Sequence, residues 1–123
     1  MKYLLTAAFL AAGVVCASEL STKPQPKPNG RIESRFKAAN EKSFPIVFMG
    51  DSITHFWESR GKTVYDKYFA GMEILNLATS GDRTENTIWV IDQVNWQKVD
   101  AKVIMLMIGT NNTGHRPLTP KVE

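Results

Sequence analysis

The sequence predicts an α/β domain in which short parallel strands alternate with helices. Three mostly apolar runs, at residues 46–49, 73–78 and 103–108, have the length and composition of strands buried in a sheet. The segments between them carry apolar residues at helical spacing. Strand–helix–strand order implies right-handed crossovers, which place the strands side by side in a parallel sheet.

The N-terminal segment lies outside this domain. Lys2 is followed by an almost unbroken apolar run over residues 3–15 and by small residues up to Ala17, the pattern of a secretory signal peptide over residues 1–17. Cleavage there leaves 123 − 17 = 106 residues and removes Cys16, the one cysteine. A membrane anchor is an alternative, but 13 apolar residues are fewer than the ~20 that span a bilayer. A lipoprotein site at Cys16 is a second alternative, against which the bulky Val15 argues. We expect a secreted or periplasmic protein without stable membrane insertion.

Residues 18–30 are predicted to be a proline-rich linker. Pro24, Pro26 and Pro28 alternate with polar residues, which favours an extended, hydrated chain. A ligand for a proline-recognising module is the alternative. The domain is then expected over residues 31–123, and it opens with a short amphipathic helix that carries Ile32, Phe36 and Ala39.

The remaining elements follow in order. Residues 46–49 form the first strand, and residues 52–57 and 62–69 are predicted helices separated at Gly61. Residues 73–78 form the second strand, and residues 84–96 a helix with Ile88, Ile91 and Val94 at mostly helical spacing. Residues 103–108 form the third and most apolar strand.

Composition limits the classes of partner. With 43% hydrophobic and 22% charged residues, the chain suits one small globular domain. The formal net charge is only +3 and the basic residues are scattered. We therefore expect no nucleic-acid partner.

Each predicted strand is followed by a group that acyl-transfer chemistry needs. Ser52 offers a hydroxyl nucleophile, Gly81 a backbone amide without a side chain in front of it, and Asn111 a neutral amide donor. Because the carboxyl ends of parallel strands meet at one edge of a sheet, we expect these three residues to gather there. They are the predicted catalytic residues, and the sequence predicts no metal and no cofactor.

Each of these residues also has a structural interpretation. A serine at a helix start is usually a cap, Gly81 could be a simple turn, and Asn111 opens a formal glycosylation sequon. Asp51 and Asp82 are expected to hold loops, as acidic side chains in turns commonly do. A phosphate or flavin site at residues 110–114 is a further alternative, but the sequence has no Gly-rich phosphate loop. The three blocks in register favour the chemical interpretation.

In these blocks the chain resembles a known family. Residues 47–54 (VFMGDSIT), 76–86 (NLATSGDRTEN) and 107–112 (MIGTNN) resemble the first three blocks of the GDSL/SGNH hydrolases. The likeness is to the branch with the catalytic subunits of brain-type platelet-activating-factor acetylhydrolase and bacterial esterase relatives. It implies a three-layer α/β/α, flavodoxin-like sheet with the strand at Ile46 between the other two. It also implies a cofactor-free serine esterase acting on a small-molecule or carbohydrate acyl ester, with Ser52 as nucleophile and the N–H groups of Ser52, Gly81 and Asn111 as oxyanion donors.

The sequence departs from that family in one respect. Members carry a later Asp-x-x-His block whose histidine activates the serine, and no such pattern occurs among the 123 residues. His55 is predicted to point away from Ser52, and His115 is the remaining candidate base. We expect an N-terminal, C-terminally truncated portion of a secreted esterase; an inactive remnant that at most binds ligand is the alternative. The strand at 103–108 would then have an open edge, which predicts self-association.

Overall fold

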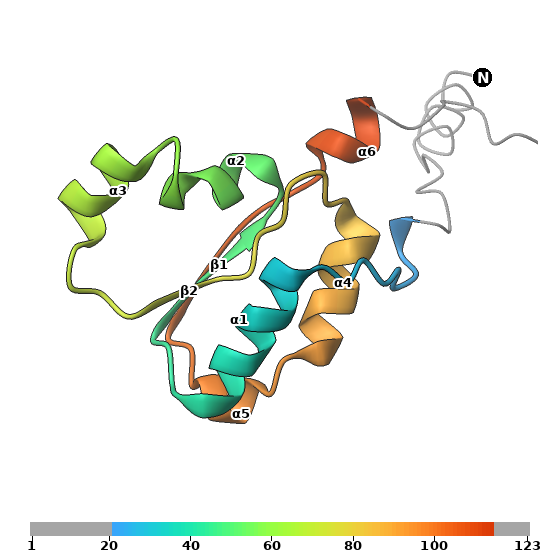
Figure 1. Ribbon diagram of the computed structural model, residues 1–123. Helices are drawn as coiled ribbons and strands as arrows, with labels where there is room; N and C mark the ends of the chain where they lie inside the picture. The colour runs from blue at the N-terminus through green and yellow to red at the C-terminus, as the bar shows by residue number, and fades with distance from the viewer. Residues whose placement is uncertain (1–20, 115–123) are drawn as a thin grey trace, which may run out of the picture.

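The computed structural model describes residues 21–114, so the expected signal peptide and His115 lie outside the described residues. Among these residues three strands form a parallel sheet in the order β2–β1–β3, as predicted (Figure 1). Ile46 of the central strand pairs with Ile74 on one side and Val103 on the other. The elements in chain order are α1 (Gly30–Glu41), β1 (Ile46–Gly50), α2 (Ser52–His55), η3 (Phe56–Glu58), α3 (Lys62–Phe69), β2 (Ile74–Asn76), α4 (Thr84–Gln93), α5 (Trp96–Val99), β3 (Val103–Met107) and α6 (Thr110–Gly114).

Helices cover both faces of the sheet, with α1, α4 and α5 on one side and α2 and α3 on the other (Figure 1). Alternation along β1 explains the arrangement, because successive side chains of a strand point to opposite faces. Val47 and Met49 pack into the core with α1 and α4, whereas Phe48 lies among aromatic rings of η3 and α3. The result is the three-layer α/β/α architecture that the family resemblance implies.

The hydrophobic core lies on the side of the sheet that α1, α4 and α5 cover (Figure 1). α1 is capped by Asn29, whose side chain accepts from the N–H of Ile32 at 3.0 Å, and it buries Ile32 and Ala39 against the sheet. The buried members of this core are Ile32, Ala39, Phe44, Val47, Met49, Leu75, Leu77, Val90, Val94 and Val99. Burial of this apolar set is the main force that holds α1, α4 and α5 to the sheet.

On the other side of the sheet, an aromatic cluster surrounds Phe48. Its ring meets Trp57, Tyr65 and Phe69 edge-on, with centroids 5.9, 6.4 and 5.4 Å away. Edge-to-face pairs of this kind are favourable beyond the area they bury. The cluster ties η3 and α3 to the central strand, and so fixes the segment that follows Ser52.

Two predicted elements differ in extent. The helix expected over residues 84–96 ends at Gln93, and α5 begins separately because Asn95 caps it, accepting from the N–H of Lys98 at 3.1 Å. The strand expected over residues 73–78 is assigned only at Ile74–Asn76. Its backbone nevertheless stays beside β1, since the N–H of Leu77 donates to the carbonyl of Phe48 at 2.7 Å.

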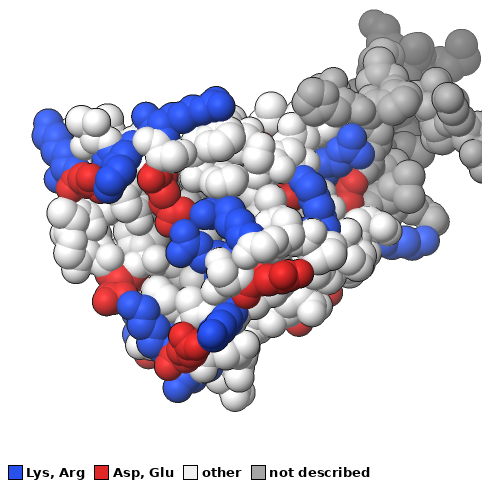
Figure 2. All heavy atoms as spheres, in the orientation of Figure 1, with Lys and Arg blue, Asp and Glu red and all other residues white. Residues whose placement is uncertain are grey.

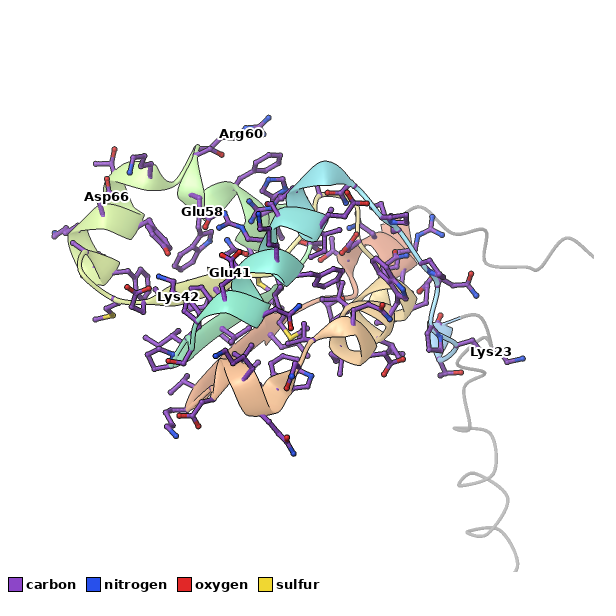
Figure 3. All side chains as sticks on the ribbon, turned by 60° about the horizontal axis from the view of Figure 1, so that its bottom comes forward. Lys23, Glu41, Lys42, Glu58, Arg60 and Asp66 are labelled. Atoms are coloured by element: carbon purple, nitrogen blue, oxygen red, sulfur yellow. The ribbon has the colours of Figure 1, made fainter. Side chains whose placement is uncertain are left out.

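Arg31 of α1 covers the outer side of β2. Its guanidinium donates to the carbonyls of Asn76 and Ala78, both at 3.1 Å, and pairs with Glu58 at 2.9 Å. Glu58 of η3, labelled in Figure 3, also accepts from Arg35 of α1 at 3.0 and 3.1 Å. Arg31 therefore links α1, β2 and the segment after Ser52.

Removing this link should destabilise the domain. In Arg31→Ala, two carbonyls and Glu58 lose a partly buried partner, so we expect the free energy of unfolding to fall by about 2–3 kcal/mol. Lys37→Ala on the same helix is the matched control, because the Lys37 side chain is 79% exposed. Its ion pair with Glu41, at 3.9 Å, is expected to contribute below ~0.5 kcal/mol to the free energy of unfolding. Urea unfolding measures both variants, and equal losses would contradict the role of Arg31.

The outer strand β3 is apolar and uncovered. Val103 is 56% exposed, Ile104 51% and Leu106 54%, although alternate residues of the strand point to opposite faces. Elsewhere, positive and negative side chains are interspersed on the face shown in Figure 2. Within residues 21–114 no helix has both the length and the apolar character needed to cross a bilayer.

Candidate active site

The first block is a tight turn at the end of β1. Gly50 has φ +147°, and a Cβ there would lie 2.2 Å from the carbonyl oxygen of Met107, so the backbone of β1 approaches β3 too closely for any side chain. Asp51 follows as the buried N-cap of α2 and accepts from the N–H of Ile53 at 3.0 Å. As expected for this acidic residue, it holds the turn.

Ser52 is the first residue of α2 and is half-buried. Its hydroxyl has no hydrogen-bond partner within residues 21–114, so among these residues no base is in contact with it. The helix is a single turn, which weakens the helix-dipole argument for a charged intermediate. The local donors are the free N–H groups of the turn itself.

The second block is joined to the first by the main chain. The N–H of Thr79 donates to the carbonyl of Gly50 at 3.1 Å, and the N–H of Asp82 closes a turn onto the carbonyl of Thr79 at 3.1 Å. Gly81 sits in this turn with φ +76°, a conformation that favours glycine, and it is exposed. The backbone N–H groups of Ser52 and Gly81 have no acceptor within residues 21–114, so both remain open to a ligand.

The third block reaches the second through Asn111. This buried side chain, on α6, donates through Nδ2 to the carbonyl of Asp82 at 2.8 Å. One N–H of its amide is thus used inside the protein, and the second N–H remains for another acceptor. Together with the approach of Gly50 to Met107, these bonds bring all three blocks to one edge of the sheet.

His55 contacts the second block and not Ser52. Its Nδ1 accepts from the N–H of Ser80 at 3.1 Å, and its ring stacks on Phe56 at 4.8 Å. Burial and, next, the positive charge of Arg31 lower the pKa of His55, which favours the neutral ring that this bond requires. His55 therefore supports the loop that carries Gly81.

Asp82 is hydrogen-bonded to several parts of the candidate site. Its backbone bonds Thr79 and Asn111. The residue is only 3% exposed, and its carboxylate accepts from Lys27 Nζ at 3.0 Å. Burial raises the pKa of Asp82 to about 6, the nearby charge of Asp51 raises it too, and the bond from Lys27 works in the opposite direction.

This pKa makes stability depend on pH in a defined direction. The folded-state pKa of about 6 lies above the ordinary 3.8, so the folded form binds more protons between these values. The stabilising contribution of protonated Asp82 is complete below pH ~4 and is lost as the pH rises through ~6, a change of about 2–3 kcal/mol. In Asp82→Asn this loss should vanish. Urea unfolding of both proteins from pH 4 to 7 measures it, and parallel pH profiles would contradict the assignment.

Comparison with known proteins identifies the family. The family description GDSL-like Lipase/Acylhydrolase matches residues 46–121, more than half of the chain. The chain belongs to this family. The GDSL match begins at the first residue of β1 and takes in all three blocks described above.

Three curated relatives illustrate the likeness. The chain is 35% identical over 82 residues to the platelet-activating factor acetylhydrolase IB subunit beta homolog of Drosophila melanogaster, covering 66% of this chain and 36% of the relative. It is 27% identical over 103 residues to the platelet-activating factor acetylhydrolase IB subunit alpha1 of Bos taurus and of Homo sapiens, covering 77% of this chain and 44% of each relative. The chain thus spans less than half the length of these GDSL relatives.

Three residues that hold the candidate site in place were not predicted from the sequence. Lys27 bonds Ser80 and Asp82, Arg31 bonds β2, and Asn112 accepts from the N–H of Thr84 at 3.0 Å and donates to Glu85 at 3.1 Å. Their partners lie 27 to 55 residues away in the chain, so no local pattern marks them. The one signal was the position of Asn112, directly after Asn111 in the third block.

Proposed function

We propose that this protein is a secreted serine esterase that removes a short acyl group, acetyl for preference, from a lipid or carbohydrate ester. Ser52 is the nucleophile, and the N–H groups of Ser52, Gly81 and Asn111 hold the oxyanion. Residues 1–17 act as the export signal.

One observation carries this proposal: three blocks far apart in the chain are joined by hydrogen bonds at one edge of the parallel sheet. There, a half-buried serine hydroxyl lies in the same cluster as two backbone N–H groups that have no acceptor within residues 21–114. Ligand sites in open α/β sheets form at this edge. Unused donors around a nucleophile are what acyl transfer requires.

The reaction has two steps. The Ser52 oxygen bonds to the ester carbonyl carbon, the carbonyl oxygen becomes an oxyanion, and the alcohol leaves with the proton that Ser52 gives up. Water then attacks the acyl-serine and releases the acid. Both steps need a base. His55, the one histidine in residues 21–114, has its Nδ1 engaged by the N–H of Ser80, so we assign the base to a residue outside this described range.

The names of the relatives support the choice of substrate. They are described as subunits of a platelet-activating factor acetylhydrolase, which is a hydrolase of acetyl esters by name. Here we extend only the acetyl-ester class to this chain. Hydrolysis of aryl esters with acyl chains of two to eight carbons tests it, with the shortest ester expected to react fastest.

A fluorophosphonate probe tests the nucleophile without a substrate. The protein expressed from its full coding sequence should bind one probe, and peptide mass spectrometry should place it on Ser52. Labelling elsewhere, or no labelling of an active esterase, would contradict the proposal. The alternative is an inactive remnant, which is favoured by the absence of a base in contact with Ser52 among the described residues; it predicts neither labelling nor hydrolysis from that coding sequence.

The exposed strand β3 also predicts self-association of the 123-residue chain when it is expressed alone. Its outer side is apolar and carries no charge that would deter pairing with a second copy. We expect sedimentation to give a mass above the monomer, and Leu106→Lys to restore the monomer. Val64→Lys is the matched control, because Val64 is 57% exposed on α3, away from any strand edge. A monomeric wild type would contradict this prediction.

A further inference from the structure

The predicted linker lies against the candidate site. Residues 21–29, here called the strap, contact the site cluster at three residues before Asn29 caps α1. Ser21 accepts from Thr84 at 2.9 Å, Gln25 donates to the carbonyl of Glu85 at 3.0 Å, and Lys27 donates to the carbonyl of Ser80 at 2.9 Å. The strap therefore binds the loop that carries Gly81 and also the first turn of α4, which follows that loop.

The prolines suit the strap to this role. A proline has no backbone N–H to satisfy and a fixed φ, so an alternating proline segment is stiff without internal hydrogen bonds. Gln25, between Pro24 and Pro26, uses both backbone groups on α4, since its carbonyl also accepts from Asn86 at 3.1 Å. Because the strap is stiff and is anchored at Gln25, the position of Lys27, two residues later, is fixed as well.

Lys27 bonds both residues that flank Gly81. Its Nζ bonds the carbonyl of Ser80 and the carboxylate of Asp82, on either side of Gly81, and lies 3.2 Å from where a Gly81 Cβ would be. Asp82 in turn holds Asn111 through its carbonyl. One ammonium group is thus connected to two of the three candidate oxyanion donors.

We propose that the strap is part of the active site and that Lys27 is a positioning residue, which fixes Gly81 and Asn111 through Ser80 and Asp82. The catalytic half of this inference rests on the proposed esterase function; the structural half does not.

An ordinary surface ion pair would not have this effect, because exposed pairs contribute little. This pair is asymmetric: the Lys27 side chain is 39% exposed and that of Asp82 only 4%. Removing Lys27 leaves a buried carboxylate without its cation, and such a group must gain a proton or move toward water. Either response displaces the turn at Gly81. The other charged group that acts on Asp82 is Asp51, whose negative charge adds to the same response.

The test compares Lys27→Met, Lys27→Arg and the control Lys37→Met by NMR. The control removes a lysine that is 79% exposed near the far end of α1. In the wild type, the Asp82 carboxyl carbon should titrate with a midpoint near 6. Lys27→Met should raise that midpoint and speed hydrogen exchange of the bonded amides of Ser80 and Asp82 by about tenfold or more. Lys27→Arg and Lys37→Met should stay close to the wild type. An unchanged midpoint and unchanged exchange in Lys27→Met would overturn the proposal.

A measurement on the unaltered protein covers the case in which Lys27→Met does not fold. The Lys27 Cε resonance should follow the Asp82 titration with the same midpoint, because the two groups are in contact. A Lys27 resonance that ignores this titration would overturn the proposal.

Steady-state kinetics of the Lys27 variants test the catalytic half of this inference. In the protein from the full coding sequence, Lys27→Met should lower kcat by about tenfold with KM nearly unchanged, and Lys27→Arg should restore it. An unchanged kcat in a variant with a disturbed loop would overturn the positioning role. If the wild type hydrolyses no ester, the proposed function fails, while titration and exchange still decide whether the strap holds the loop.

Discussion

Replacing Ser52 by alanine should reduce ester hydrolysis by at least about 10³-fold in the protein expressed from its full coding sequence. The substitution removes only the hydroxyl group. This group has no hydrogen-bond partner within residues 21–114, so the domain should keep its stability. Asp51 still caps α2 in the variant. Hydrolysis of a short-chain aryl ester and urea unfolding measure the two effects.

Ser43→Ala is the matched control for Ser52→Ala. Ser43 is exposed in the connection between α1 and β1, away from the three blocks. It should keep the wild-type rate. If Ser52→Ala retained more than a few per cent of that rate after removal of contaminating esterases, Ser52 would not be the nucleophile.

Replacing Asn111 by alanine should lower kcat by about 10²–10³ with little change in KM, because an oxyanion donor acts mainly in the transition state. The variant also loses the bond from Nδ2 to the carbonyl of Asp82, which should cost about 1 kcal/mol of unfolding free energy. Steady-state kinetics at a pH and temperature where the variant is folded separate the two effects.

Asn112→Ala distinguishes oxyanion binding from simple loss of a loop contact. The neighbouring side chain bonds Thr84 and Glu85, at the start of α4, and has no bond to Asp82. We expect it to reduce stability and to leave kcat within about tenfold of the wild type. A rise in KM alone in Asn111→Ala would make Asn111 a residue that binds the ground state.

Most of the fold could be predicted from local patterns. Apolar runs marked the three strands, and the family resemblance placed the strand at Ile46 in the middle of the parallel sheet, as the structure confirms. The boundary at Gln93 could not be predicted by periodicity, because Ile91 and Val94 continue the apolar pattern while Asn95 starts a new helix by capping it. Caps compete with periodicity at element ends, and a single polar side chain decides the outcome.

The candidate site was predictable only in part. The blocks with Ser52, Gly81 and Asn111 stand at strand ends in the sequence, and the structure brings those blocks together; their catalytic roles stay predictions. The bond of Asn111 to the carbonyl of Asp82 and the bond of His55 to Ser80 depend on the folded path of the loop. The signal peptide and the role of His115 also stay predictions, because both lie outside residues 21–114.

The close approach of Gly50 to Met107 has a consequence for synthesis on the ribosome. The backbone at Gly50, just before Ser52, packs against a carbonyl that lies 107 − 50 = 57 residues later in the chain. At about 5–20 residues per second, translation needs roughly 3–11 s to supply it. During that interval Val47 and Met49 have no β3 beside them, and the apolar strand β1 lacks one of its two neighbours. The turn before Ser52 therefore cannot take its final form until Met107 has been made.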